Sequence, residues 1–463
     1  MAETIKCISP VDGSLYASRP VASRKDIAAT FAAAHAAQAK WRKVPLKERA
    51  AHCLAAVEAM LAMKDEIVPE LAWQMGRPVR YGAGELRGFE ERARYMIAVA
   101  ERALEAIVPD PKDGFLRFIR REPLGVVFTI APWNYPYLTA VNSIIPAIMA
   151  GNTVVLKHAA NTLLVAERFQ KAFDKAKLPK GVFQHLVLNH KQTADIISGG
   201  HANMVCFTGS VAGGKAMEQA AAGRFINLGL ELGGKDPAYV RPDANLAHAI
   251  ENLVDGAYFN SGQSCCGIER IYVHKKVWGD FIDGFVDLTR NYVLGSPLEE
   301  ATTLGPLVKA EAADFVRKQI RAALRAGALA HVDPRSFALD KAGTPYMAPQ
   351  VLTNVNHQMS VMMEESFGPV VGIMKVADDA EAIELMNDSP YGLTAAIWTE
   401  DAAAAQRIGD EIATGTVFMN RCDYLDPALT WTGVKDTGRG ATLSVVGYEA
   451  LTRPKSYHLR TRT

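Results

Sequence analysis

The sequence carries little excess charge of either sign and contains no long hydrophobic run. Its 463 residues include 51 basic and 50 acidic side chains, which leave a formal net charge of +1. Such a balance provides no overall field to hold a polyanion, which argues against nucleic acids and anionic membranes as partners. No apolar run reaches the roughly 20 residues that a membrane-spanning helix needs. These absences predict a soluble protein with no membrane partner.

The cysteine, proline and glycine residues also give no sign of a disulfide-linked, collagen-like or largely disordered protein. The six cysteines are scattered without disulfide-framework spacing, as expected of free thiols in a reducing compartment. Residues 1–20 lack the basic and then apolar pattern of a secretory signal. The 23 prolines and 36 glycines are near ordinary usage, which excludes a collagen-like or largely disordered chain. The sequence therefore predicts a cytoplasmic globular protein, and its length predicts two or more domains.

Several well-known site motifs are also missing. The sequence has no GxxxxGK[ST] phosphate loop, no HExxH and no His/Cys cluster with zinc spacing, so we expect no metal site. The nearest match to GxGxxG runs from Gly82 through Gly84 to Gly88, one residue too long and inside a stretch of helical character. Because a dinucleotide loop must follow a strand, this segment is interpreted as a glycine-containing helix.

The order of apolar segments indicates an α/β architecture. The first hundred residues show helical periodicity, and residues 115–121 have the composition of a strand exposed on at least one side. Short apolar runs then alternate with segments of helical character. The runs are Val126–Ile130, 153–156, 183–188, 204–207 and 226–230; the helical segments are 138–149, 162–176, 192–198 and 212–222. This alternation predicts a parallel sheet covered on both faces, with ligands at the carboxyl ends of its strands.

A second α/β series extends from about residue 236 to about residue 420, and residues 454–463 resemble a final strand with a basic tail. Two segments of the first series follow predicted strands and carry polar groups. Asn134, in the segment 131–136, could donate its amide to a developing oxyanion, or could occupy an ordinary proline-bracketed turn. Ser210, in the segment 207–214, could begin a helix that binds phosphate, or could simply cap that helix.

Two further segments carry potentially reactive side chains. Glu231 begins the segment Glu-Leu-Gly-Gly-Lys and could act as a general base, or could lie in a solvated turn. Cys265 and Cys266 follow Asn-Ser-Gly-Gln-Ser, a setting of small and polar residues that is unlike a packed core. A free cysteine is more often a small buried hydrophobe than a nucleophile, so this segment alone is ambiguous.

Taken together, these segments resemble the aldehyde dehydrogenase superfamily over nearly the whole chain. Lys157 follows Asn134 by 23 positions and Cys265 follows Glu231 by 34, and both spacings are similar to the family pattern. A further block, residues 365–369 with the sequence Glu-Ser-Phe-Gly-Pro, looks like the family signature E-x-F-G-P. The combination is far more specific than any one segment.

The resemblance implies catalytic roles. Cys265 would be the nucleophile, forming a thiohemiacetal and then a thioester, and Cys266 would be a non-catalytic neighbour. Asn134 and the backbone N–H of Cys265 would form the oxyanion hole. Glu231 would activate the water that releases the acid. The implied activity is oxidation of an aldehyde to the carboxylic acid with NAD or NADP.

The resemblance also implies a cofactor site. Lys157 would hold the adenosine ribose, Glu365 would hold the nicotinamide ribose, and Phe367 would pack beside the nicotinamide. The remaining cofactor residues would be Trp133 and, near the pyrophosphate, Gly209 and Ser210. Where the family often has a glutamate, this sequence has Ala160, which removes a ribose partner but also removes repulsion against a 2′-phosphate. The choice between NAD and NADP therefore stays open.

The implied fold combines a Rossmann-like parallel-sheet cofactor domain, an α/β catalytic domain and a small β oligomerisation element. We expect the dinucleotide-binding domain at residues 1–113 and 124–233, the catalytic domain at 234–433 and the oligomerisation element at 114–123 and 434–463. The resemblance further implies a homodimer or homotetramer in which the strand at 115–121 and the final strand form an inter-subunit sheet.

The substrate is less well defined. Candidates to line the aldehyde channel are Tyr135, Thr139, Asn142, Cys422, Tyr424 and Trp431. The aromatic members favour an apolar or aromatic aldehyde, although each could equally pack at a domain interface. An acidic semialdehyde of the succinate-semialdehyde type is the alternative and would need a guanidinium, for which Arg421 is the candidate. A CoA-acylating relative, disfavoured by Glu231, and a catalytically silent binding protein are the remaining alternatives.

Overall fold

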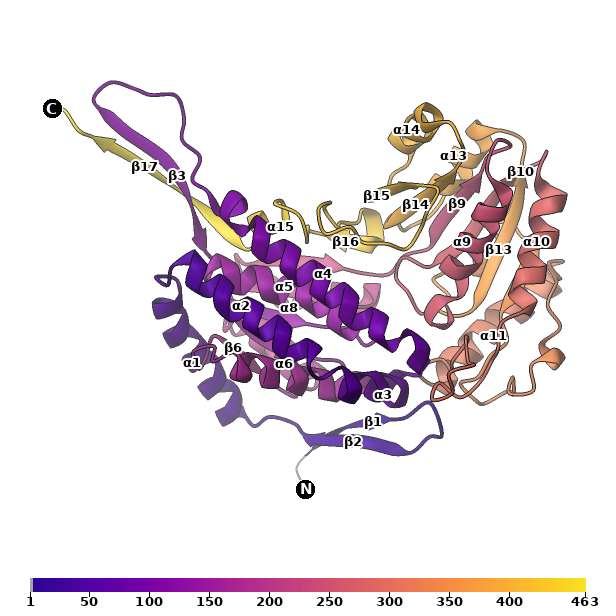
Figure 1. Ribbon diagram of the computed structural model, residues 1–463, viewed down its shortest axis with the longest axis horizontal. Helices are drawn as coiled ribbons and strands as arrows, with labels where there is room; N and C mark the ends of the chain where they lie inside the picture. Colours follow the sequence, from indigo (N-terminus) through magenta and orange to yellow (C-terminus); the bar gives the residue numbers. More distant parts are fainter. Residues whose placement is uncertain (1–2) are drawn as a thin grey trace.

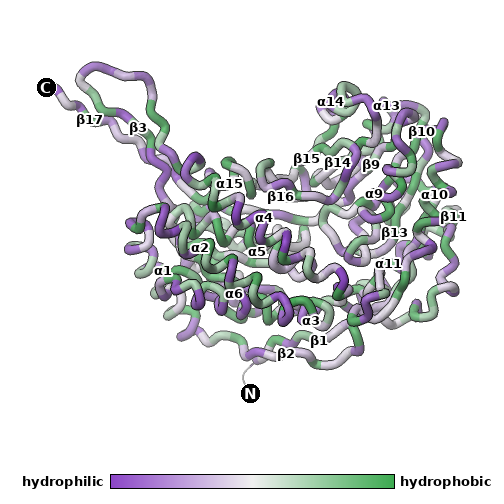
Figure 2. Tube along the Cα trace, viewed as in Figure 1, coloured by the Kyte–Doolittle hydropathy of each residue, from purple (hydrophilic) through white to green (hydrophobic). Residues whose placement is uncertain are grey.

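The computed structural model describes residues 3–463 as two lobes and a projecting arm (Figure 1). Each lobe contains a mainly parallel sheet with helices packed on it, as the alternation of strands and helices predicts. Figure 2 shows that hydrophobic stretches are concentrated inside the lobes, where they form strands such as β10 and β13. The predicted α/β fold with parallel sheets is therefore confirmed. Within the described residues, no helix combines the length and apolar composition needed to cross a bilayer.

The first sheet has six strands in the order β16-β8-β7-β4-β5-β6. Their bounds are β4 Val126–Ile130, β5 Thr153–Lys157, β6 Phe183–His185, β7 Met204–Thr208, β8 Asn227–Glu231 and β16 Gly438–Arg439. Strands β4 to β8 are parallel, and β16 joins the edge antiparallel to β8. Central strand β4 is buried at every position, as expected for a sheet covered on both faces.

Helices of the first half of the chain pack around this sheet. Their bounds are α1 Arg24–Trp41, α2 Leu46–Leu61, α3 Lys64–Met75, α4 Val79–Leu104, α5 Pro136–Ala150, α6 Leu163–Lys175, α7 His190–Ser198 and α8 Val211–Ala221. The Gly82–Gly88 segment lies inside α4, which confirms that it is helical and not a dinucleotide loop. Helix α4 packs along α5, and these two helices form one wall of the cavity described below.

The second sheet has seven strands in the order β11-β12-β13-β10-β9-β14-β15. Their bounds are β9 Asp236–Val240, β10 Ile268–His274, β11 Leu329–Ala330, β12 Gln350–Thr353, β13 Val370–Val376, β14 Thr394–Trp398 and β15 Thr416–Met419. Only β11 runs antiparallel to its neighbour. The helices of this half are α9 Leu246–Tyr258, α10 Trp278–Arg290, α11 Ala310–Arg325, α12 Ser360–Met363, α13 Asp379–Asn387 and α14 Ala402–Glu411, and the short α15 Gly447–Ala450 precedes the arm.

The arm is a two-stranded antiparallel ribbon that leaves the body of the molecule (Figure 1). Strand β3 (Phe115–Pro123) pairs along its whole length with β17 (Thr452–Arg460). Its aromatic rings stack across the pair, as in Phe118 and Tyr457, whose centroids lie 4.5 Å apart. The two strands that the sequence predicted therefore form, and they pair with each other within one chain.

The structure corrects the prediction at two places. The first hundred residues are not all helical, because Thr4–Ile8 (β1) and Leu15–Pro20 (β2) form an antiparallel hairpin. These strands are short and partly exposed, so they lack the apolar periodicity that identifies a buried strand. The strand expected at 183–188 ends at His185, and the chain beyond it forms a loop before α7.

The two sheets meet end to end. Strand β8 ends at Glu231 and β9 begins at Asp236, so the carboxyl end of the first sheet adjoins the amino end of the second. Residues that follow strands of the first sheet therefore face residues that precede strands of the second, including Cys265 before β10. The sequence predicts only the first half of this arrangement, because the carboxyl-end rule for ligand sites concerns one sheet at a time.

Candidate active site

A cavity of about 310 Å³ contains both reactive side chains that the sequence singled out. Cys265 and Glu231 line it together, although they come from opposite sheets. Helices α4 and α5 form one wall, and the loop 423–431 forms another. The cavity is therefore a space in which a small molecule can contact the thiol and the carboxylate at once.

Cys265 follows a strained turn that fixes its direction. Asn260 and Ser261 have φ of 53° and 57°, a left-handed conformation that L-residues adopt rarely and that accumulates at functional sites. Ser261 Oγ donates to the carbonyl of Gly305 at 2.8 Å, and Gln263 Oε1 accepts from the backbone N–H of Val308 at 2.7 Å. These buried bonds hold the turn so that Cys265 is half-buried at the cavity while Cys266 is buried.

The backbone on the far side of Cys265 is packed closely against the Glu231 loop. A Cβ on Gly234 would collide with the carbonyl oxygen of Cys265, so only glycine allows this approach. A hydrogen bond with Cys266, burial and the charges of Asp236 and Glu231 together raise the pKa of the Cys265 thiol well above its ordinary value. The thiol is therefore held protonated until a base or a bound group shifts that balance.

Glu231 is the last residue of β8 and lies between two cavities. Its carboxylate accepts hydrogen bonds from Thr442 Oγ1 at 2.6 Å and Thr208 Oγ1 at 2.9 Å. Burial raises the pKa of Glu231, and these hydroxyls oppose that effect. The second cavity, of about 30 Å³, has room for one or two water molecules, since a single water needs roughly 10–15 Å³. Glu231 is thus a carboxylate with a raised affinity for protons and with space for water beside it, as a general base requires.

Asn134 is buried beside the Cys265 loop. Its Nδ2 donates to the carbonyl of Gln263 at 3.2 Å, two residues before Cys265. Its own backbone carbonyl accepts from Arg77 and from Asn260 Nδ2, and Arg77 forms a buried ion pair with Glu85. The side chain is not among those that line the cavity, so the structure brings Asn134 to the loop but directs its amide toward the loop backbone.

The residues expected to hold the nicotinamide half of a dinucleotide lie together. The rings of Trp133 and Phe367 meet edge to face with centroids 5.6 Å apart. Glu365 Oε1 accepts from the backbone N–H of Gly234 at 3.0 Å, and burial followed by the charge of Glu269 raises the pKa of Glu365 to about 8. Glu269, which sequence analysis missed, also accepts the backbone N–H groups of residues 366 and 367 and so fixes this loop.

The residues expected at the adenosine and pyrophosphate end are separate from the main cavity. Lys157 ends β5, and burial lowers the pKa of its ammonium group. Within residues 3–463 it has neither a hydrogen bond nor an ion pair from its side chain. Gly209 and Ser210 immediately precede α8, whose first turn presents free N–H groups. A partly buried cation without a partner among the described residues suits an anionic dinucleotide, and so does the helix N-terminus at Ser210.

The cavity wall differs in part from the expected channel. Tyr135, Thr139, Asn142, Tyr424 and Trp431 line the cavity as expected. Cys422 does not, because its Sγ donates to the carbonyl of Asn252 at 3.5 Å on the far side of the loop. Arg421 does not either, since its guanidinium stacks on the ring of Tyr424 at 3.9 Å from the centroid. The arginines that do line the cavity are Arg77, Arg87 and Arg92, for which the sequence gave no local signal.

Comparison with known proteins agrees with this geometry. The Aldehyde dehydrogenase family pattern matches residues 1–457. A succinate-semialdehyde dehydrogenase [NADP(+)] of Mycobacterium avium is 32% identical over 458 residues, which cover 98% of this chain and 96% of that protein. An aldehyde dehydrogenase of Paenarthrobacter nicotinovorans is 33% identical over 446 residues, covering 96% of this chain and 97% of the relative.

Solved structures give the same answer. The succinic semialdehyde dehydrogenase of Streptococcus pyogenes, solved in complex with NADP+, superposes with a TM-score of 0.93 at 27% identity, covering 98% of this chain and all of that one. The match thus spans both lobes, the arm and every segment that surrounds the Cys265 cavity. On this evidence the chain belongs to the aldehyde dehydrogenase family and is an NAD(P)-dependent enzyme of that family.

Proposed function

We propose that this protein oxidises an aldehyde to the corresponding carboxylic acid through a covalent intermediate on Cys265. The observation that carries the proposal is that Cys265 and Glu231 line one cavity. A nucleophile and a base within one cavity are what a two-stage acyl transfer requires. Binding, thiol attack and release of the acid can then all occur at one place.

In the first stage the Cys265 thiol loses its proton to water, and the sulfur of the resulting thiolate attacks the carbonyl carbon and forms a thiohemiacetal. The alkoxide that develops needs fixed N–H donors, and loss of one such donor typically costs about 10²–10³ in rate. We assign this role to the backbone N–H of Cys265 and to the Asn134 amide. In the structure that amide donates to the carbonyl of Gln263, so it must leave this bond to reach the oxyanion.

In the second stage an acyl group is bound to Cys265 as a thioester, and water must remove it. Hydride acceptance from the carbonyl carbon is the chemistry that a nicotinamide supplies when bound. Lys157, Gly209, Ser210, Trp133, Glu365 and Phe367 are the residues we assign to holding the dinucleotide. Glu231 takes a proton from water in the adjoining space, and the hydroxide formed attacks the thioester to give acid and free thiol.

A CoA-acylating enzyme is the alternative chemistry on this fold. Glu231, a half-buried carboxylate with room for water beside it, favours hydrolysis over transfer to a thiol acceptor. Acid formed without CoA supports the proposal, whereas product formed only when CoA is present contradicts it.

Two substrate classes have separate support. The rings of Tyr135, Tyr424 and Trp431 in the cavity wall support an apolar or aromatic aldehyde. The names of the mycobacterial and streptococcal relatives support an acidic semialdehyde. The choice of NAD or NADP stays equally open, because no carboxylate stands at Ala160.

Initial rates test the proposed function directly. Aliphatic, aromatic and carboxylated aldehydes are offered with NAD and NADP in parallel, and both reduced dinucleotide and acid are measured. We expect equal amounts of the two products with at least one class of aldehyde. Dinucleotide binding without reduction across the whole panel would instead indicate a binding protein.

We further propose the domain division given by the sequence, a cytoplasmic location and a homodimer or homotetramer. The exposed strands β3 and β17 support the oligomer, since a projecting two-stranded ribbon leaves free edges for a second copy of this chain. Sedimentation as a monomer at micromolar concentration would contradict it.

A further inference from the structure

Two buried arginines line the Cys265 cavity, and only one of them is neutralised. Arg77 forms a buried ion pair with Glu85 and also donates to the backbone carbonyl of Asn134. Arg77 lies just before α4, and Arg92 lies within that helix. Arg92 is 8% exposed, yet it forms no ion pair with any acidic side chain in residues 3–463. Burying a charge without a partner is costly, so proteins rarely retain it without a reason.

The hydrogen bonds of Arg92 leave most of its donors free. Its Nη1 donates to the carbonyl of Leu138 at 2.8 Å and to Oδ1 of Asn142 at 3.4 Å. Within the described part of the chain, Nε and Nη2 have no acceptor. Burial lowers the pKa of Arg92, while the acidic groups of Glu85, Cys266, Glu231 and Cys265 raise it. The guanidinium therefore lies within electrostatic reach of the reactive thiol.

Asn142, which holds Arg92 from α5, also has an unfilled donor. It is only 2% exposed, and its Nδ2 has no hydrogen-bond partner in residues 3–463. A buried amide N–H without an acceptor is unusual and requires an explanation. Asn142 and Arg92 both line the cavity and are joined by a hydrogen bond, so two adjacent donor groups lie in its wall.

No acidic side chain of the wall forms an ion pair with Arg92 among the described residues, although the charges of Glu85 and Glu231 act on it. Glu91 is exposed and accepts a hydrogen bond from the hydroxyl of Tyr424 at 2.6 Å. Burial, together with the charge of Asp255, raises the pKa of Asp423 to about 7, so this carboxyl is only partly ionised at neutral pH. Arg87, which lines the outer part of the cavity and is exposed, adds a second cation without an ion pair among the described residues.

We propose that Arg92 and Asn142 form an anion subsite that binds the carboxylate of an aldehyde acid while its carbonyl carbon lies at Cys265. The inference rests on the proposed function and specifies its substrate class. A carboxylate would accept hydrogen bonds from the free guanidinium donors and from Asn142 Nδ2, and the aromatic wall would cover the carbon chain between the two ends. Arg87 at the cavity mouth would attract the anion toward this subsite.

Matched substrates test the subsite without confusing it with the chemistry. Succinate semialdehyde is compared with its methyl ester, which keeps the shape but loses the charge, and with 4-aminobutanal, which reverses it. For the wild-type enzyme we expect the highest kcat/KM with the free acid. In Arg92→Gln, the ratio of kcat/KM for the acid over the ester should fall by about 30- to 100-fold, as loss of a buried charge-assisted hydrogen bond predicts.

Three further variants separate recognition from folding. Arg92→Lys should restore part of the ratio because it keeps the charge, and Asn142→Leu should lower the ratio mainly through KM. Arg94→Gln is the matched control, since Arg94 lies on the same helix but pairs with Glu58 and Glu90 on its outer face. We expect its ratio to equal that of the wild type. Binding of succinate, measured by calorimetry, should weaken in Arg92→Gln and not in Arg94→Gln.

The outcomes are distinguishable. If the wild type oxidises the ester or 4-aminobutanal better than the acid, or if Arg92→Gln changes acid and ester equally, the subsite is wrong while the dehydrogenase activity stands. If the wild type oxidises none of the three or of the wider panel, the proposed function fails. Succinate binding that depends on Arg92 would then still support the subsite, and binding that does not would contradict it.

Discussion

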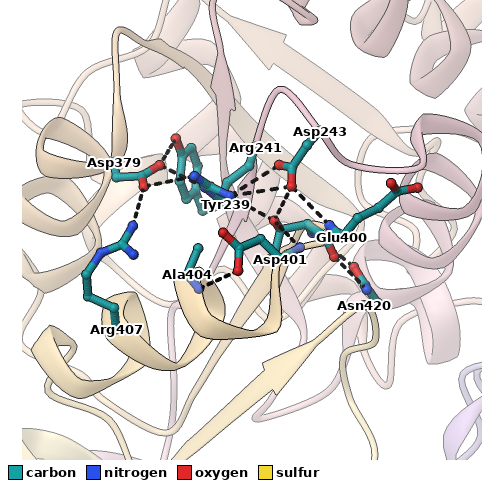
Figure 3. Close-up of polar contacts among 10 residues, drawn as sticks. Tyr239, Arg241, Asp243, Asp379, Glu400, Asp401, Ala404, Arg407 and Asn420 are labelled. Atoms are coloured by element: carbon teal, nitrogen blue, oxygen red, sulfur yellow. Dashed lines mark hydrogen bonds and ion pairs between the residues drawn. The ribbon is translucent and has the colours of Figure 1, made fainter.

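Two clusters of charged side chains in this molecule are organised in opposite ways. At the carboxyl end of the second sheet, Arg241 donates from Nε to Asp379 at 3.0 Å and from Nη1 to Thr399 at 2.9 Å (Figure 3). Asp379 also accepts from Tyr239 and Arg407, so each charge in this cluster has a partner. At the amino end of the same sheet, the Cys265 cavity contains Arg92, which forms no ion pair among residues 3–463. Lys157, which lies outside that cavity, also has no ion pair among these residues.

The comparison indicates which charges serve the fold and which serve a ligand. In the Arg241 cluster, the interactions join β9, α13 and α14, because Arg241 and Arg407 both bind Asp379 (Figure 3). Around the cavity, strained backbone, raised carboxyl pKa values and free donors occur together. Such features lower stability and persist where function requires them. The predictions below test this distinction.

The largest effect is expected at Cys265. Cys265→Ala should reduce turnover by about 10⁴-fold or more, because the residue that forms the covalent intermediate is lost. Dinucleotide affinity, measured by fluorescence titration, should change little. Cys266→Ser is the matched variant and should retain turnover within about tenfold. Comparable losses in both variants would contradict the assignment of the nucleophile.

Glu231→Gln should separate the two stages. We expect a burst of reduced dinucleotide followed by a steady rate lower by about 10²–10⁴, the usual contribution of a general base. Because the pKa of Glu231 is raised, the acidic limb of the wild-type kcat profile should lie above the range of an ordinary glutamate, and activity should rise with pH through it. A linear time course, or the same acidic limb in the variant, would show that another group is the base.

A smaller effect, on dinucleotide binding, is expected when Lys157 is replaced. Lys157→Met should weaken dinucleotide binding by about tenfold, the value of one charge-assisted hydrogen bond. The thermal stability of the free protein should not fall, since the ammonium has no partner to lose among residues 3–463. Unchanged dinucleotide affinity in isothermal titration, or a clear loss of thermal stability, would show that Lys157 stabilises the fold and does not bind the dinucleotide.

Substitutions in the Arg241 cluster should lower the stability of the protein and leave its activity unchanged. Asp379→Asn should lower the free energy of unfolding by about 1–3 kcal/mol and leave kcat unchanged. Although burial opposes it, hydrogen bonds from Arg241 and Tyr239 lower the pKa of Asp379. Its stabilisation is therefore present at neutral pH and is lost as the pH falls below the ordinary value of 3.8. Arg92→Met should not destabilise the protein in the same denaturation assay; if it does, Arg92 is structural.

Local sequence patterns were sufficient to predict those strands and site residues whose evidence lies within one short segment. Strand Val126–Ile130 forms with the predicted bounds because it is a short, wholly apolar run between turn residues. Glu231 and Cys265 could be singled out because each lies in a glycine-containing segment at a predicted strand or helix end. Each of these segments is ambiguous alone, and the resemblance to one family assigned them to a single active site.

Other features depend on tertiary contacts and leave no local trace. Arg92 looks like any arginine of a long amphipathic helix, and only the packing of α4 on α5 places it beside Asn142. Thr442 meets Glu231 across 211 positions of sequence, and Glu269 reaches the 365–367 loop from another strand. The N-terminal hairpin was missed because its strands are too exposed to show apolar periodicity.

The most direct test of the central claim is the position of the acyl group. Glu231→Gln is mixed with an oxidisable aldehyde and dinucleotide, quenched in acid during the stalled phase, and the peptide spanning residues 260–266 is sequenced by mass spectrometry. The account predicts one acyl addition on Cys265 and none when Cys265 is replaced by alanine. An acyl group on Cys266, or an unmodified peptide from enzyme that has reduced its dinucleotide, would contradict it.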